Sequence, residues 1–201
     1  MITSASASTL FSRLRHIIAT KPMVRGMISY SILWPTGSLL QQTMENKKFG
    51  DYDWKRVLRY SMYGSLYVAP TLHYFMRLTS HMWPVISLRT GIYKAVLDQM
   101  AYGPFAVTSF YLLMTLMESK TWDEACTEVK NKFFPTYKVG LCVWPILQTI
   151  NYSFVPERNR LIYVSVCSLI WTSFLAYVKQ MDAAHLAEFK EHQPHLRHSQ
   201  N

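Results

Sequence analysis

The sequence predicts an all-α protein, a polytopic transmembrane helix bundle of four to five spans with an N-terminal amphipathic helix and an interfacial helix. Half of the residues are hydrophobic, and the 16% that are charged leave five long runs without formal charge. These runs cover 26–44, 60–76, 99–117, 139–156 and 161–178. About 20 helical residues cross the roughly 30 Å of a bilayer's hydrocarbon, and each run is close to that length. The alternative is a soluble bundle with unusually apolar helices, which a mean hydropathy of +0.02 would suit.

The predicted chain has three parts: a basic amphipathic segment at 1–21 that resembles a targeting sequence, a transmembrane helical domain at 22–180, and a polar flexible tail at 181–201. Residues 1–44 contain no acidic residue, and arginines flank an apolar helical face near the start. Such a segment is typical of a mitochondrial import helix. The alternative is a basic amphipathic helix that lies on whichever membrane the protein occupies.

Three helices are predicted before residue 120. They run from about Pro22 to Gln42, from Trp54 to just before Trp83, and from Ser87 to Met117. Only the second half of the third helix is free of charge, so Arg89 and Lys94 are expected at the lipid headgroups. Asp98 and Gln99 then mark the point at which this helix passes into the hydrocarbon.

A capping box at Thr121 and Glu124 predicts the start of a further helix. Apolar residues then recur every three or four positions opposite charged ones, which is typical of a helix lying at a surface. We expect this interfacial helix to cover 121–134 and to end at Pro135, because proline lacks the N–H that a helix interior needs. The fourth and fifth spans follow in the last two charge-free runs.

Seven polar residues inside the predicted spans are candidates for lining a pore. They are Gln41, Gln42, His73, Asp98, Gln99, Gln148 and Asn151. An unpaired polar group in hydrocarbon costs several kcal/mol, so these side chains should face other helices or water. Gln148 and Asn151 share one helical face because they lie three residues apart. The four amides at 41, 42, 148 and 151 fit an uncharged pathway for hydrophilic solutes, and they equally fit hydrogen bonding between helices.

Asp98 is the most costly of these residues, since a carboxylate at mid-span costs about 2.5–3.5 kcal/mol. With Gln99 it could set a preference for cations or gate a pore. The alternative is a buried ion pair, for which the candidate partners are Lys94, Arg59 and Arg160. His73 could titrate as a pH sensor, or it could be a packed, hydrogen-bonded side chain.

Prolines inside the predicted spans are hinge candidates. They are Pro35, Pro70, Pro104 and Pro145. A proline removes one backbone hydrogen bond and permits a bend, although a static kink that only shapes the packing is the alternative. Arg160 and Trp171 are predicted to anchor the last span at the membrane interface.

The net charge of +9 favours an anionic membrane surface over nucleic acid, because the basic residues lie between the spans and form no stripe. The three cysteines have no metal-binding or redox spacing. His192, His195 and His198 recur every third residue, but Pro194 interrupts any shared helical face, so a solvated tail is expected there. The sequence has no glycine-rich phosphate loop and no nucleophile motif, and we expect no metal, no cofactor and no catalytic residue.

The last two predicted spans carry a distinctive pattern of aromatic, proline and amide residues. Its members are Trp144, Pro145, Gln148, Asn151, Tyr152, Val155, Pro156, Arg160, Trp171, Leu175 and Tyr177, with Gly64, Pro70, His73, Asp98, Gln99 and Pro104 fitting upstream. This pattern resembles the Mpv-seventeen/peroxisomal membrane protein family. The sequence departs from the family at Ala69, where glycine is usual, and at Phe75 and Met76, where Trp-Tyr is usual.

The resemblance implies four spans and residence in the mitochondrial inner membrane or, for some relatives, in the peroxisomal membrane. It also implies a channel-like role for small molecules, linked to nucleotide supply, mitochondrial DNA maintenance and control of reactive oxygen species.

A weakly selective channel for small solutes in the mitochondrial inner membrane is therefore the leading hypothesis for the function. The alternative is a membrane scaffold or assembly factor that docks other proteins through its basic loops and the 121–134 helix. An intramembrane enzyme ranks third, because it would need His73 and Asp98 within hydrogen-bond reach in an open cleft. The candidate partners are the lipid bilayer, small solutes and a second copy of the chain, with no direct binding of nucleic acid.

Overall fold

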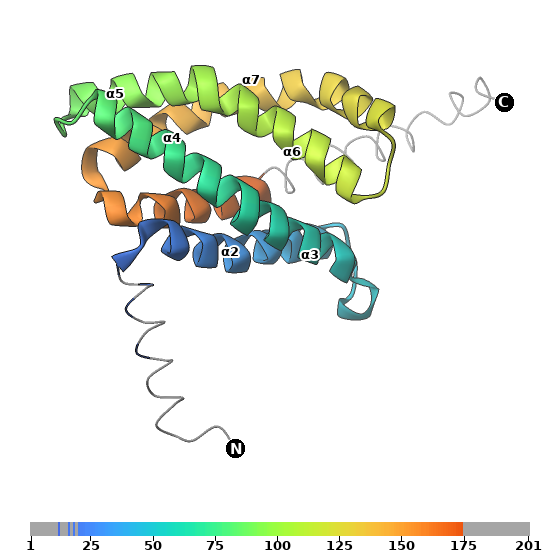
Figure 1. The fold of residues 1–201 in the computed structure, drawn as a ribbon. Coiled ribbons are helices and arrows are strands. Elements are labelled where there is room, and N and C mark those ends of the chain that lie inside the picture. Colours follow the sequence, from blue (N-terminus) through green and yellow to red (C-terminus); the bar gives the residue numbers. More distant parts are fainter. Residues whose placement is uncertain (1–11, 13–15, 17, 19, 175–201) are drawn as a thin grey trace, which may run out of the picture.

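The computed structural model describes residues 12, 16, 18 and 20–174, and every regular element in this part of the chain is a helix (Figure 1). In chain order they are α2 (Pro22–Met44), η1 (Phe49–Asp51), α3 (Trp54–Met62), η2 (Tyr63–Val68), α4 (Ala69–Met82), α5 (Leu88–Leu97), η3 (Asp98–Tyr102), α6 (Gly103–Met117), α7 (Trp122–Phe154) and η4 (Glu157–Asn159). A final helix follows η4 and is described over residues 160–174. The predicted all-α class is confirmed for these residues. Most of the predicted segment at 1–21 and all of the predicted tail at 181–201 lie outside them.

Short sequence signals place the helix starts correctly. α2 begins at Pro22, where the missing N–H costs no hydrogen bond. The Ser87 side chain caps α5 by accepting a hydrogen bond from the Thr90 N–H at 3.2 Å. Thr121 and Glu124 form the predicted capping box at the start of α7.

The predicted break at Pro135 is wrong, because α7 is one helix that runs through Pro135 and Pro145. Pro135 removes the helical partner of the Asn131 carbonyl. Asn131 is exposed, so water can bond this carbonyl in place of the missing N–H. The stretch at 121–134 is therefore the first part of α7 and not a separate interfacial helix.

Two of the helical rods each contain one widened turn. α3, η2 and α4 form one continuous rod, and α5, η3 and α6 form another, with η2 and η3 as π-helical turns. Each π-turn ends two residues before a proline, Pro70 in one rod and Pro104 in the other. Proline has no N–H to donate to the carbonyl four residues earlier, and the wider turn accommodates this missing hydrogen bond. Pro35 and Pro145 lie inside regular α-helix, and the role of all four prolines as hinges stays a prediction.

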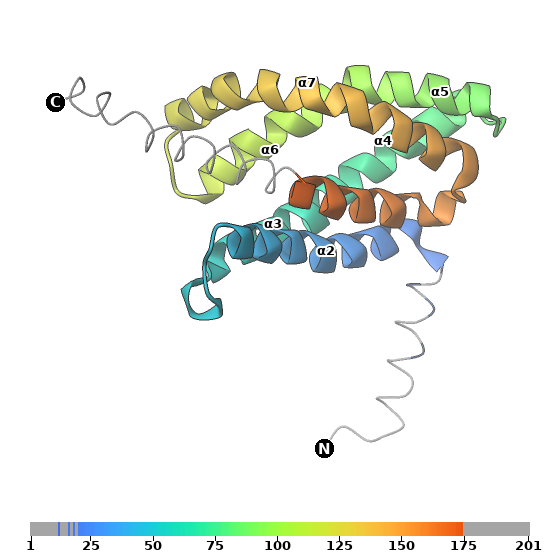
Figure 2. The same ribbon diagram turned by 180° about the vertical axis from the view of Figure 1, so that it is seen from behind.

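The helices pack in two groups, and one rod crosses diagonally between the groups. Figure 1 shows α5, α6 and α7 on one side, α2 and the final helix on the other, and the rod of α3 and α4 crossing from one group to the other. The view from behind gives the same order (Figure 2). α2 and the final helix lie close together, with the hydroxyls of Ser29 and Ser165 only 2.6 Å apart. Such small residues at helix contacts are common in membrane bundles.

Polar and charged residues share the interior of the bundle with apolar ones, unlike in a typical soluble protein. The buried residues include Lys94, Asp98, Gln148, Asn151 and Arg160, while many large apolar side chains are exposed. Among the described helices, one stretch, Leu88–Met117, is long and apolar enough to cross a membrane by length and composition alone. These two properties therefore do not confirm the predicted count of four to five spans.

Candidate functional site

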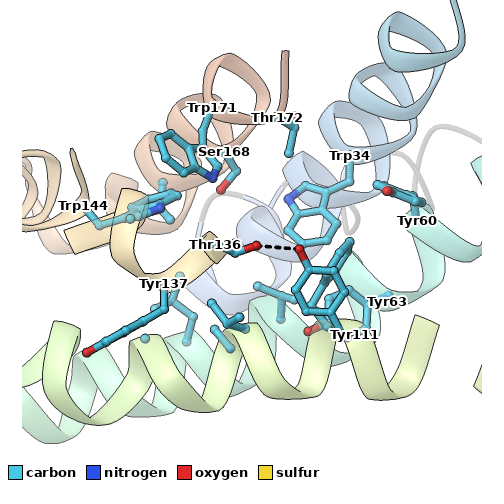
Figure 3. Close-up of a pocket in the computed structure, with 18 of the residues that line it drawn as sticks. Trp34, Tyr60, Tyr63, Tyr111, Thr136, Tyr137, Trp144, Ser168, Trp171 and Thr172 are labelled. Carbon is cyan, nitrogen blue, oxygen red and sulfur yellow. Dashed lines mark hydrogen bonds between the residues drawn. The ribbon is translucent and has the colours of Figure 1, made fainter. Parts of the chain in front are cut away.

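A cavity of about 770 Å³ lies inside the bundle, lined by residues of α2, the two rods with a π-turn, α7 and the final helix (Figure 3). Its mouth is at the end where α2 is connected to α3, because the exposed residues Glu45 and Asn46 line it there. Its floor is made of buried residues, Leu72, Asp98 and Gln148. A volume of this size is typical of sites for small organic molecules.

Between mouth and floor the cavity is bounded by aromatic side chains (Figure 3). This aromatic wall consists of Trp34, Tyr60, Tyr63, Phe110, Trp144 and Trp171. The ring centroid of Trp34 lies 5.5 Å from that of Tyr63, and the centroids of Trp144 and Trp171 are 6.2 Å apart. A glycine allows this packing, since a Cβ at Gly64 would lie 2.9 Å from Cγ of Trp34. A larger residue at position 64 would displace the indole.

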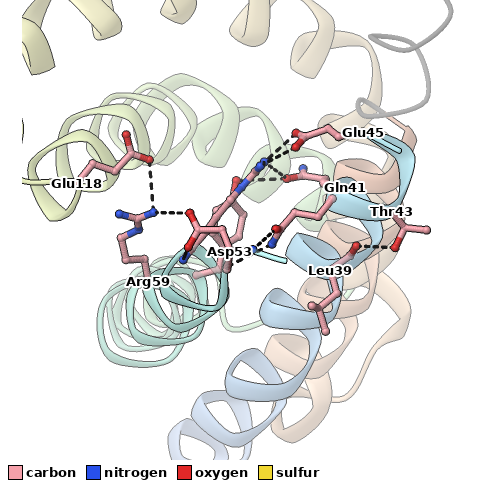
Figure 4. A network of polar contacts seen from close by, with 10 residues as sticks. Leu39, Gln41, Thr43, Glu45, Asp53, Arg59 and Glu118 are labelled. Carbon is pink, nitrogen blue, oxygen red and sulfur yellow. Dashed lines mark hydrogen bonds and ion pairs between the residues drawn. The ribbon is translucent and has the colours of Figure 1, made fainter. Parts of the chain in front are cut away.

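A network of polar contacts that includes Gln41, Glu45 and Asp53 braces the mouth of the cavity (Figure 4). Nη1 of Arg56 on α3 donates to the two carboxylate oxygens of Glu45 at 3.0 and 3.1 Å. Nη2 of the same side chain donates to Oε1 of Gln41 at 3.1 Å. Gln41 and Arg56 both line the cavity, so these contacts connect the end of α2 to the start of α3 at the mouth.

Asp53 and Gln42 fix the start of α3. The Asp53 carboxylate accepts a hydrogen bond from the Arg56 N–H at 2.9 Å, and this bond, with the nearby Arg59 guanidinium, lowers the pKa of Asp53 below its ordinary value. Gln42 holds the backbone of the same residue, accepting from the Asp53 N–H at 2.6 Å and donating to its carbonyl at 3.4 Å. Gln42 is 0% exposed and does not line the cavity, so its role in this structure is to clamp α2 to α3.

Asp98 and Gln148 form the polar part of the floor. Asp98 is 5% exposed, accepts a long hydrogen bond from the Tyr152 hydroxyl at 3.5 Å, and has the Gln148 amide close to the same carboxylate. Within the described part of the chain Asp98 has no ion pair, so the expected pairing with a basic residue does not occur there. Oε1 of Gln148 accepts a hydrogen bond from Asn151 Nδ2 at 3.0 Å. Asn151 itself is buried behind the floor and is not part of the lining.

Beyond the floor, two cations lie over the ring of one tyrosine. We call Lys94, Tyr152 and Arg160 the plug. Nζ of Lys94 lies 5.8 Å from the centroid of the Tyr152 ring, and Cζ of Arg160 lies 5.5 Å from it, as in cation–π contacts. Arg160 donates to Oγ of Ser80 at 2.9 Å and to the Tyr152 carbonyl at 3.3 Å. The plug therefore lies beyond the cavity floor, near the end of the bundle where α7 is followed by the final helix.

Residues 115–176 match the Mpv17 / PMP22 family. An Mpv17-like protein of Bos taurus is 30% identical over 159 residues, which cover 79% of this chain and 79% of the relative. Protein SYM1 of Saccharomyces cerevisiae is 30% identical over 162 residues, covering 76% of this chain and 75% of the relative.

The chain belongs to the Mpv17 / PMP22 family. An Mpv17-like protein of Xenopus laevis, 27% identical over 161 residues, covers 80% of this chain and 78% of the relative. No solved structure matches the chain. The family membership confirms the resemblance found in the sequence, and it makes this chain an organelle membrane protein.

Other predicted site residues of this Mpv17 / PMP22 family member lie in several places. Gln99 lines the cavity, and its carbonyl accepts a hydrogen bond from the Tyr137 hydroxyl at 2.8 Å. Trp171 is part of the aromatic wall, whereas Arg160 is 2% exposed and is held in the plug. His73 is half-buried beside Tyr74 and is not part of the lining.

The intramembrane enzyme considered from the sequence would need His73 and Asp98 within hydrogen-bond reach of each other. No hydrogen bond or ion pair joins His73 to Asp98 among the residues that the structure describes. The same residues contain no cluster of three or more His, Cys, Asp or Glu side chains that could hold a metal ion.

The sequence did not predict the aromatic wall or the bracing of the mouth by Arg56. A signal for the wall exists, because Tyr30 and Trp34 are four residues apart on α2 and Tyr60 and Tyr63 are three apart on the next rod. This spacing shows a shared helical face, but it does not tell whether that face meets lipid or a cavity.

Proposed function

We propose that this protein is a five-span channel for small solutes, with the cavity as one half of its pathway. The observation that carries the proposal is a cavity with an exposed mouth and a floor made by a buried carboxylate and a buried amide, Asp98 and Gln148. Polar groups placed inside a bundle of otherwise apolar helices are typical of solute pathways.

Outward-facing apolar stripes support five membrane crossings. On each rod and long helix, exposed large apolar side chains recur mainly at intervals of four, which places them on one helical face. The stripes are Ile28, Ile32 and Leu40; Leu58, Met62 and Leu66; Ile92, Val96 and Met100; Ile146, Ile150 and Phe154; and Val166, Ile170 and Phe174. A surface of this kind suits lipid better than water.

The inward-facing polar residues explain why hydropathy alone finds fewer spans. α2, for example, has an outward apolar stripe, but it also contains Ser38, Gln41 and Gln42 on its inner side. These residues lower the mean hydropathy of the helix without meeting lipid. A membrane helix that lines a polar interior therefore scores below one that is apolar all round.

Conduction through the bundle requires the plug to open. The cavity reaches Asp98 and Gln148, and the plug residues lie between this floor and the far end of the bundle. An aromatic ring held by two cations is a compact barrier, and its displacement would join the cavity to the other side. We assign the plug as the gate of the proposed channel.

We further propose the mitochondrial inner membrane as its location, with the peroxisomal membrane as the alternative. The basic N-terminal stretch without acidic residues supports the first, because such segments direct import into mitochondria. A relative named as a PXMP2/4 family protein, from Dictyostelium discoideum, is 30% identical over 168 residues and leaves the second open.

A scaffold is the second candidate function, and one surface favours it. The first turns of α7 expose Trp122 and Phe134, which are 60% and 75% accessible, beside the charged side chains of that helix. An amphipathic helix with exposed aromatic residues suits the docking of another protein.

Current recordings from purified protein in planar bilayers decide between the two. A channel gives discrete openings, and Gln148→Leu, which replaces the amide of the floor with an apolar group, lowers the unitary current by raising a dewetting barrier. Ile150→Leu on the lipid-facing side of the same helix is the matched control and leaves the current unchanged. Absence of any current from correctly inserted wild type would overturn the channel and leave the scaffold.

A further inference from the structure

Two buried hydrogen-bond donors on the cavity wall lack a hydrogen bond of ordinary geometry among the residues that the structure describes. Tyr30 and Trp34 lie one turn apart on α2, with ring centroids 5.7 Å apart, and both line the cavity. Among the described residues, nothing accepts from the buried Nε1 of Trp34. The buried Tyr30 hydroxyl has the Ser168 side chain nearby but forms no hydrogen bond of ordinary geometry. Figure 3 shows the indole nitrogen of Trp34 on the side of the cavity where Ser168 and Trp171 lie. Because an indole N–H can only donate, an occupant of the cavity must supply an acceptor there.

The wall around these donors favours a flat, conjugated occupant. Trp34 is surrounded by Tyr63 at 5.5 Å and Phe110 at 6.2 Å between ring centroids, and Trp144 and Trp171 complete the wall across the cavity. Aromatic faces and edges at such separations pack best against another planar π-system. The cavity of about 770 Å³ has room for one.

The charges along the cavity favour an occupant without a formal charge in this region. The cations at the mouth already have partners, since Arg56 pairs with Glu45 at 3.0 Å and Lys132 pairs with Glu128. The only carboxylate among the described residues of the floor, Asp98, lies deeper in the bundle. The aromatic middle of the cavity therefore presents hydrogen-bond donors and π-faces.

We propose that the cavity is a binding site for a planar, uncharged conjugated ring that carries carbonyl oxygens, with one carbonyl accepting from Trp34 and Tyr30. Two sources offer this chemistry: quinones dissolved in the membrane, and water-borne ring compounds such as flavins. The site does not depend on the proposed conduction of solutes, so binding and current can be tested separately on the same preparation.

Binding of two probes to the purified full-length protein in detergent tests the proposal. Decylubiquinone represents the membrane source and riboflavin the aqueous source, and calorimetric titration gives the dissociation constant of each. Trp34→Phe and Tyr30→Phe each remove one donor and keep a ring. Each is expected to weaken binding about 3- to 10-fold, as for the loss of one hydrogen bond. Trp122→Phe, a substitution at an exposed tryptophan outside the cavity lining, is the control and leaves the constant unchanged.

Each outcome has a definite meaning. Binding of decylubiquinone alone assigns the membrane source, binding of riboflavin alone assigns the aqueous source, and binding of both supports the shared chemistry. Failure of both probes to bind at about 1 mM would overturn the proposal. Binding that neither Trp34→Phe nor Tyr30→Phe weakens would overturn it too, because the ring would then sit elsewhere.

Discussion

Tyr152 donates a hydrogen bond to Oδ1 of Asp98 at 3.5 Å, and this contact lies where the cavity ends. The Lys94 amine and the Arg160 guanidinium both lie over the same ring. One side chain therefore connects the floor of the cavity to the plug behind it. A change at Tyr152 should affect the pathway without touching the mouth.

Replacing Tyr152 with alanine should increase the unitary current several-fold in planar bilayers, because the side chain that closes the floor is removed. Tyr152→Phe keeps the ring that the two cations contact and should retain a current near that of the wild type. Thermal unfolding of both variants checks that the bundle still forms, since a buried ring contributes to stability as well. A folded Tyr152→Ala protein with an unchanged current would exclude the plug as the gate.

Asp98→Asn should abolish any preference for cations, because the substitution keeps the shape of the floor and removes its negative charge. The reversal potential under a gradient of potassium chloride measures this preference directly. Asp51→Asn, at an exposed carboxylate of η1, is the control and should leave the reversal potential where it was. Equal reversal potentials for wild type and Asp98→Asn would show that permeating ions do not pass this carboxylate.

Gly64→Ala should lower the free energy of unfolding by about 1–3 kcal/mol, as expected for overpacking. A Cβ at this position would lie 2.9 Å from Cγ of Trp34 and would push the indole into the cavity. Gly50→Ala is the matched control, since a Cβ there meets nothing within 4 Å. Thermal unfolding in detergent, followed by the fluorescence of tryptophan, measures both changes. A Gly64→Ala protein as stable as Gly50→Ala would mean that Trp34 can shift at little cost.

Acid should weaken the start of α3 through Asp53. The pKa of this carboxyl is lower in the folded protein, because it accepts the Arg56 N–H, so the stability it contributes is present at neutral pH. That contribution is lost as the pH falls below about 4, through the ordinary pKa of aspartate and then the lowered one. Asp53→Asn should flatten this part of the plot of melting temperature against pH. If the melting temperatures of both proteins fell equally at acid pH, the loss of stability would be due to other carboxylates.

Local signals were enough to predict the helices but not their continuity. Pro22, Ser87 and Thr121 mark helix starts because each acts through its own first turn. Pro135 was a misleading signal, since whether a helix continues past a proline depends on how the freed carbonyl is solvated and on packing along the rest of the helix. Those terms come from the tertiary structure.

The polar part of the site could be predicted for a different reason. A charge or an amide in hydrocarbon is costly wherever it lies, so Asp98, Gln99 and Gln148 had to face inward, and all three line the cavity. The same argument could not distinguish Gln41, at the mouth, from its neighbour Gln42, which clamps the Asp53 backbone. Adjacent residues point in different directions, and only the packing of α2 against α3 decides which one meets the cavity.

The π-turns at η2 and η3 mark the positions where a single residue can be inserted or deleted without disturbing the rest of the bundle. Each turn contains one residue more than a regular α-turn, so the extra residue is absorbed locally and the two halves of each rod keep their faces. A deletion of one residue in a regular helix such as α7 would instead rotate everything beyond it by about 100° and turn a lipid-facing stripe toward the interior. Insertions and deletions of single residues among homologues should therefore gather just before Pro70 and Pro104.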